Sequence, residues 1–153
     1  MTEPQAEAVT RPMALYLEYM AVGEQQLFEA RKIIELNAVE AAADNITEDG
    51  IEQLRTALVI EREASSEELP SLQRDLHVQI AKLSGNPVLS LFVTVLNDLL
   101  EDRTAPMVHI SQAVAEPVHR AHESIVEAII SGDGALARHR MMRHLDAIHD
   151  WLA

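Results

Sequence analysis

The sequence predicts an all-α protein, folded as an antiparallel bundle of about seven helices, and three observations support this. Hydrophobic residues make up 48% of the 153 residues, which is enough for the core of one domain. Aromatic residues account for only 3%, and the chain has just 5 Gly and 6 Pro. An aliphatic core with few turn-formers favours helices over a β-sandwich. Apolar residues also recur at helical spacing along almost the whole chain.

The first part of the chain contains a short tail and four predicted helices. Residues 1–12 are polar and include two prolines, so we expect a tail or the remnant of a linker. Gly23 interrupts the periodicity that begins at Met13. Thr47 has the pattern of an N-cap, because two acidic residues follow it where the helix dipole favours anions. These signals place helices over residues 13–22, 24–44, 48–64 and 69–84.

The second part contains three more predicted helices, over residues 88–103, 111–131 and 134–152. Its clearest boundary is Ser84-Gly85-Asn86-Pro87, which combines a glycine that ends one helix with an N-cap asparagine and a proline at the first helical position. The helix over 88–103 is apolar nearly all round, so we expect it to run through the middle of the bundle or to cover a partner chain. Short connections predict antiparallel packing, with residues 13–153 as one domain.

Charge and cysteine content limit the classes of function. Twelve basic against 25 acidic residues give a net charge of −13, which excludes nucleic-acid binding by this chain alone. There is no cysteine, hence no disulfide framework or thiolate chemistry, as in many cytoplasmic proteins. No apolar run approaches the roughly 18–20 residues of a membrane span. The composition therefore predicts a soluble, acidic, cytoplasmic domain with no membrane partner.

Histidines provide the strongest indication of a site. His122 and His144 lie within the apolar stripes of two predicted helices, and His77 lies at the edge of a third, one turn after Gln73. Several buried imidazoles are costly unless something satisfies them, and neutral imidazole is a common ligand for Zn, Ni, Mn or Fe. We interpret the three as a shared metal site; the alternative is three core histidines, each bonded to a neighbour. The remaining histidines are expected outside this site: His109, His119, His139 and His149.

Arg31 is the second unusual residue, because it lies on the apolar face of its helix. One interpretation is an i,i+4 salt bridge to Glu35. The other is a guanidinium that points into the bundle and holds a ligand carboxylate. The acidic stretch 61–68 is interpreted as a solvated face and loop. Glu116-Pro-Val-His119 is a single Glu-x-x-His motif, whereas a di-iron bundle needs two such motifs and two further Glu residues.

Four segments resemble the FadR-type C-terminal domain (FCD), the effector-binding domain of one branch of GntR transcription regulators. Residues 29–35 (EARKIIE) resemble its e-x-R-x-x-[LI]-E motif, and residues 76–87 (LHVQIAKLSGNP) its FH-x-x-[LI]-A-x-x-SGNP motif. Residues 122–133 (HESIVEAIISGD) match H-x-x-I-x-x-A-I-x-x-GD, and residues 141–145 (MMRHL) resemble M-x-x-HL. The resemblance extends over about residues 15 to 152, with the motifs in order.

The resemblance implies a divalent metal with a small organic acid bound over it. In that family a D-x-x-x-H pair and one His from each of the last two helices hold the metal, which maps onto His77, His122 and His144, with Arg31 as the motif arginine. Gln73 occupies the aspartate position, so the implied site has three His with water or a weak Gln73 carbonyl, which is acceptable for zinc or nickel. Asp75 lies on another side of the helix.

The family also implies a homodimer that meets operator DNA only through an N-terminal winged helix-turn-helix, which this chain does not contain. The chain is then a fragment of a regulator or a stand-alone effector domain. Two alternatives stay open: a metal-dependent enzyme and a metal-free helical interaction module. Because we see no carboxylate on the histidine stripes placed as a general base, and no HExxH, GxSxG or P-loop motif, we assign no catalytic residue.

Overall fold

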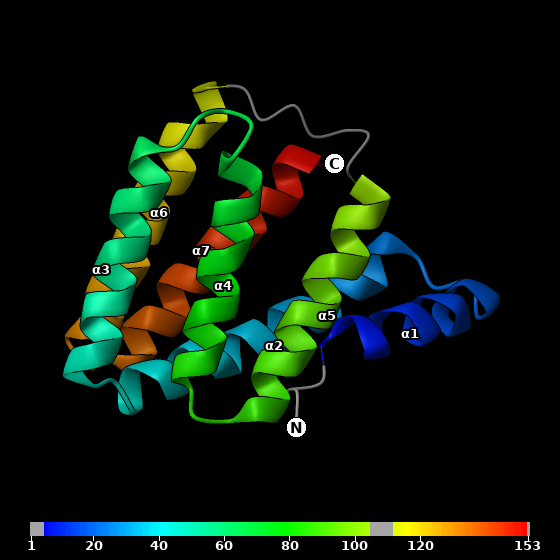
Figure 1. Ribbon diagram of the computed structural model, residues 1–153, viewed down its shortest axis with the longest axis horizontal. Helices are drawn as coiled ribbons and strands as arrows, with labels where there is room; N and C mark the ends of the chain where they lie inside the picture. Colours follow the sequence, from blue (N-terminus) through cyan, green and yellow to red (C-terminus); the bar gives the residue numbers. More distant parts are fainter. Residues whose placement is uncertain (1–4, 105–111, 153) are drawn as a thin grey trace.

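The computed structural model describes residues 5–104 and 112–152, and these residues form seven α-helices and no strand (Figure 1). The helices are α1 (Glu7–Tyr19), α2 (Glu24–Asp44), α3 (Glu48–Glu63), α4 (Leu69–Leu83), α5 (Pro87–Thr104), α6 (Gln112–Ile130) and α7 (Gly134–Leu152). The predicted all-α class with seven helices is confirmed. None of the described helices is long and apolar enough to cross a membrane.

Local capping explains most of the helix boundaries. Thr47 accepts a hydrogen bond from the Gly50 amide (3.1 Å), and Asn86 accepts one from the Val88 amide (3.0 Å). Gly85 has φ +76°, the left-handed conformation that ends α4 at small cost in a glycine. These signals are local in sequence, and the predicted boundaries around them agree with the structure to within a residue or two.

The first helix differs from the prediction. It begins at Glu7 and ends at Tyr19, so residues 7–12 are helical although we expected them to belong to a tail. Pro12 lies inside the helix, and its presence had suggested a break. Figure 1 shows α1 extending along one side of the bundle, beside α5.

Helices α2 and α5 lie at the centre of the bundle, each packed against several other helices. Helix α2 contacts α4, α5, α6 and α7. Helix α5 packs among α1, α2 and α4, which explains why it is apolar on nearly every face. Among the large apolar residues of α5 that the structure describes, only Val88 (57%) and Phe92 (37%) are exposed. The first of our two expectations for this helix, a course through the middle of the bundle, therefore accounts for most of its apolar surface.

Candidate metal centre

Three helices each bring one histidine to the same point inside the bundle. His77 comes from α4, His122 from α6 and His144 from α7, and each is at most 4% exposed. The Nε2 atom of His144 lies 3.2 Å from that of His77 and 3.0 Å from that of His122. One ligand atom from each ring lies within 4.8 Å of the others, and no second group of this kind occurs in the part of the chain that the structure describes. The sequence pattern therefore picked three residues that meet in space.

Two buried glutamates orient these rings from behind. The Nδ1 atom of His77 is hydrogen-bonded to Glu35 on α2, and the Nδ1 atom of His122 is 2.7 Å from Glu61 on α3. Both glutamates are only 2% exposed. Because a carboxylate accepts the Nδ1 proton, the Nε2 atom of each of these two rings carries a lone pair. A histidine whose second nitrogen donates to a carboxylate is the usual arrangement around a protein-bound metal.

The three converging nitrogens cannot satisfy one another fully. His144 Nε2 can donate one proton, yet both neighbouring Nε2 atoms are acceptors, so at least one buried lone pair has no proton to accept. A cation at the centre removes this conflict. Zinc–nitrogen bonds of about 2.0–2.1 Å in a tetrahedral site put two nitrogens roughly 3.3–3.4 Å apart. The Nε2–Nε2 separations of 3.0 and 3.2 Å are close to that distance, so the residues fit a zinc-like ion.

Burial keeps His122 and His144 in the neutral form that binds metals. The pKa of His144 lies well below its ordinary value, because of burial first and then its neighbours His122, His77 and Arg31. Burial likewise lowers the pKa of His122, although the hydrogen bond that it donates to Glu61 opposes this shift. Both groups are therefore uncharged at neutral pH.

The two glutamates are held as carboxylates despite their burial. Burial alone would raise the pKa of Glu35, but Arg31 and His77 together lower it to about 2. Burial would also raise the pKa of Glu61, and the hydrogen bonds from His122 and His119 outweigh it, so this pKa is lowered too. The histidine cluster thus has two fixed negative charges directly behind its rings.

Arg31 and Gln73 lie close to the centre and have unused donors. The Nε atom of Arg31 donates to Glu35 (2.6 Å), which confirms the predicted i,i+4 salt bridge. No other hydrogen bond of this guanidinium occurs within residues 5–104 and 112–152, and its side chain is 13% exposed. Gln73, 9% exposed, has an amide nitrogen without a hydrogen-bond partner in the same residues. Neither side chain is saturated by the protein around it.

The roles of the two glutamates were not predicted from the sequence. Glu61 belongs to the stretch 61–68 that we expected to be solvated, and this is wrong for Glu61, which is buried. The available signal was its spacing: it lies seven residues after the buried Leu54, on the same face of α3. Glu35 was recognised only as a partner of Arg31. Both buried glutamates come from helices other than those of the three histidines, so the expectation that no carboxylate on the histidine stripes is placed as a general base is not changed by them.

The other histidines that the structure describes do not belong to the group of three. His119 is buried beside them, with Nδ1 2.7 Å from Glu61 and Nε2 3.3 Å from Glu123. His149 is 2.8 Å from Gln25 Oε1, and His139 is exposed. His109 lies outside the described residues.

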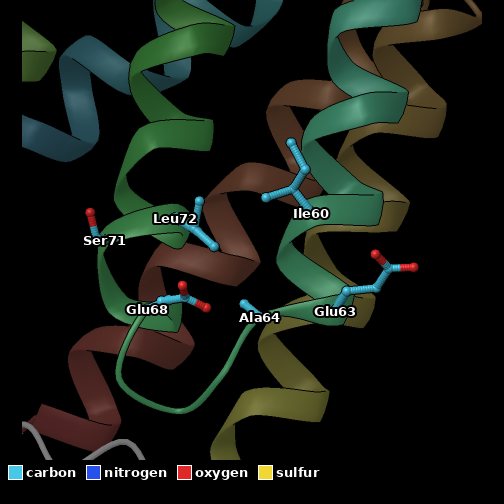
Figure 2. Close-up of a pocket in the computed structure, with 6 residues that line it drawn as sticks. All are labelled: Ile60, Glu63, Ala64, Glu68, Ser71 and Leu72. Carbon is cyan, nitrogen blue, oxygen red and sulfur yellow. The ribbon is translucent and has the colours of Figure 1, made fainter.

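Two hollows open on the α3 side of the bundle. One of about 440 Å³ lies between α3 and α4, where Figure 2 shows Ile60 and Leu72 facing each other across the gap. The other, of about 270 Å³, is lined by Glu61 and His119 among others. It therefore reaches the carboxylate that holds His122.

Comparison with known proteins places this arrangement in a family. The FCD domain family matches residues 26–147. The HTH-type transcriptional regulator LutR of Bacillus subtilis (strain 168) is 25% identical over 167 residues, which cover 100% of this chain and 73% of LutR.

Two solved structures share the fold. Streptococcus agalactiae GntR superposes with a TM-score of 0.67 at 23% identity, over 82% of this chain and 57% of that one. The E. coli protein McbR/YncC superposes with a TM-score of 0.67 at 19% identity, over 86% of this chain and 69% of that one. The chain thus spans little more than half the length of the first of these proteins.

Proposed function

The chain belongs to the FCD domain family, whose members occur in transcriptional regulators. We propose that it is the ligand-sensing and dimerisation domain of a GntR/FadR-type regulator. We further propose that it binds a small organic acid over a divalent metal held by His77, His122 and His144. In this proposal the domain is no enzyme: its output is a change in the arrangement of helices, and it acts in the cytoplasm. Operator DNA is met through a separate N-terminal domain.

The metal proposal rests on three histidine rings whose Nε2 atoms converge on one point. In two of these rings, Nδ1 is hydrogen-bonded to a buried carboxylate. A metal-free interaction module would leave this conflict of buried lone pairs unresolved. Zinc suits three nitrogen ligands with an open position, and nickel, manganese and iron also bind imidazole. When bound, the ion would supply a positive, open coordination position for an anion.

Arg31 supports the proposal that the ligand is an organic acid. Its Nε atom is engaged by Glu35, which fixes the guanidinium plane and leaves the terminal nitrogens able to bind a carboxylate through two parallel bonds. Arg31 lies close enough to contribute to the lowered pKa of His144. Gln73 stands where the family has an aspartate, so this centre has one negative charge fewer. An acid that completes the metal coordination gains from that difference.

The two glutamates do not favour the enzyme alternative. Each is already bonded through its carboxylate to a histidine ring, and Glu35 to Arg31 as well. A general base must instead be able to reach a substrate proton and accept it near neutral pH, and the pKa of both groups is lowered.

A homodimer is the proposed assembly. Helix α5 is largely internal, so another surface has to provide the interface. The exposed apolar side chains of α1 and of the residue directly after it offer one: Leu15, Tyr16, Tyr19 and Met20. Light scattering at micromolar concentration should give twice the chain mass of 17.0 kDa. A mass of one chain would contradict the dimer.

Metal analysis tests the centre. The chain, incubated with Zn²⁺ and desalted, should retain about one zinc per chain. His77→Ala, His122→Ala and His144→Ala should each lose most of it, whereas His139→Ala, a substitution of an exposed histidine on α7, should retain it. Retention of zinc by His122→Ala would exclude the proposed ligand set.

A further inference from the structure

Two buried amide nitrogens in the described residues lack a hydrogen-bond partner: Nε2 of Gln73 and Nδ2 of Asn97. Asn97 is only 4% exposed and lies in α5. A buried donor without an acceptor is costly, and native proteins keep few of them. Gln73 stands at the aspartate position of the family motif, whereas no sequence pattern singled out Asn97.

The packing of α5 against α4 puts Asn97 at the level of His77. Near one end of this helix pair, Val93 of α5 packs against Ala81 of α4. Towards the other end, Arg74 of α4 pairs with Glu101 of α5. Asn97 lies midway between the two α5 positions, and His77 lies midway between the two α4 positions. Because the helices run antiparallel, these two residues share a level.

The packing of α5 against α2 shows which part of α2 lies beside Asn97. Val93 packs against Ala38, whereas Leu100 clusters with Leu27. Asn97 therefore lies beside the stretch of α2 between these residues, which includes Arg31. It also continues the face of α5 that Val93 presents to both neighbouring helices, since the two are one turn apart. Arg31 and Asn97 thus provide unused donors near the level of His77, and Gln73 provides another one helical turn away on α4.

The charges at this level limit the ligand that would use these donors. The positive charges are those of Arg31 and of a divalent ion. The negative charges are the carboxylates of Glu35 and Glu61, so the net charge is one positive unit. A monoanion neutralises it, whereas a dianion would leave a buried net negative charge. An amide N–H is itself uncharged and recognises an oxygen acceptor, such as a hydroxyl or carbonyl, without needing a second carboxylate.

We propose that Asn97 contacts the effector and determines its specificity, and that with Gln73 it selects a monocarboxylic acid with a second, uncharged oxygen close to the carboxylate. This inference rests on the proposed function, which supplies the metal and the Arg31 contact. Asn97 adds the choice among acids. The unpartnered nitrogens are the donors that such an oxygen satisfies.

Calorimetric titration of matched acids into the zinc-loaded chain tests this selection. The pairs are acetate with glycolate and butyrate with 2-hydroxybutyrate, and malonate is the dianion. The unaltered chain should bind each hydroxy acid about tenfold more tightly than its parent acid, which is the effect of about one well-placed hydrogen bond. Malonate should bind more weakly than glycolate. Asn97→Leu should lower the affinity for the hydroxy acids about tenfold and leave that for acetate and butyrate unchanged.

Thermal unfolding of the zinc-loaded, acid-free protein gives a second readout that a purely structural asparagine would not produce. Asn97→Leu removes an unpartnered donor at nearly constant volume, so the Tm should rise by about 2–4 °C. Thr94→Val is the matched control on the same helix, because the Thr94 hydroxyl already donates to Ser90 O (2.8 Å). This control should not gain stability, and it should keep the preference for hydroxy acids.

The outcomes separate the two proposals. Equal binding of the paired acids, or an unchanged preference in Asn97→Leu, overturns the role of Asn97 and leaves the metal-and-acid site in place. A lowered Tm in Asn97→Leu overturns it as well. Binding of zinc but of none of the acids overturns acid sensing itself, and this inference with it.

Discussion

The two sides of the histidine cluster differ in how far the protein satisfies its own polar atoms. On the α3–α6 side, both oxygens of Glu61 accept hydrogen bonds, one from His119 and one from His122. On the α2–α4–α5 side, the amide nitrogens of Gln73 and Asn97 have no partner in the described residues. The saturated side can hold its rings in place without a ligand. The unsaturated side is where an incoming molecule gains new bonds, so the asymmetry separates positioning from recognition.

The saturated side predicts the largest effect on stability. Glu61→Ala removes a buried carboxylate and leaves two buried ring nitrogens unpaired, so we expect a loss of about 3–5 kcal/mol in the free energy of unfolding. Urea denaturation of the metal-free chain measures it. Glu63→Ala, an exposed change on the same helix, should stay within about 0.5 kcal/mol. A loss below about 1 kcal/mol for Glu61→Ala would mean that this side is not the stabilising one.

The open side predicts a large effect on binding rather than on stability. Arg31→Ala should weaken carboxylate binding by about 2 kcal/mol, or roughly thirtyfold, since a charged hydrogen-bonding group is lost. Most of the zinc should remain, because the three histidines are unchanged. Titration of acetate, with parallel zinc analysis, tests both statements. If zinc and acetate were lost together, the division between positioning and recognition would fail.

Acid should destabilise the metal-free protein in two stages. The unfolded His144 takes up a proton near pH 6.5, but the folded residue has a pKa well below this, through burial and then through His122, His77 and Arg31. The unfolded state therefore binds more protons, and stability falls as the pH drops below about 7, by up to about 1.4 kcal/mol per pH unit for each such group.

Glu35 adds the second stage of this loss. Despite burial, its neighbours lower its pKa from 4.5 to about 2, so the stability that it contributes is complete above pH 4.5 and is lost as the pH falls towards 2. Urea denaturation from pH 7 down to pH 3, in steps of one unit and in the presence of a chelator, measures the first stage and follows the second into the range where Glu35 takes up its proton. Equal stability at pH 7 and pH 5 would contradict the neutral, buried state of His144.

The smallest predicted effect concerns Gln73, which lies on the unsaturated side beside the proposed metal ligands. Gln73→Asp restores one negative charge beside the metal, so zinc should bind more tightly and acetate more weakly, each by about 1 kcal/mol after screening and desolvation. Gln79→Asp, which adds the same charge elsewhere on α4, is the control. Should Gln73→Asp leave both affinities unchanged, residue 73 takes no part in the site.

The sequence predicted those features that depend on neighbours along the chain. Each histidine of the cluster lies within the apolar stripe of its own helix or, for His77, at its edge, so helical periodicity alone predicted that it points inward. Thr47 and Asn86 cap their helices through residues two or three positions away. Prolines were the exception, because Pro12 lies inside α1 although its type usually marks a boundary.

The features that the sequence did not predict depend on contacts between helices. Glu61 and His122 are 61 residues apart, and Glu35 and His77 are 42 apart. A buried carboxylate is stable only with such a partner, so without the fold a solvated glutamate was the simpler expectation. Asn97 is similar: its level relative to His77 follows only from the packing of α5 on α4.

The chain of contacts from Arg31 through Glu35 to His77 has a thermodynamic consequence. Both proposed ligands touch it, the acid at the arginine and the metal at the histidine, and the glutamate between them is shared. If one ligand changes the affinity for the other by some factor, the second must change the affinity for the first by the same factor. The domain would then respond to the product of two concentrations: scarce metal would be retained when the acid is abundant, and the metal supply of the cell would set the acid threshold.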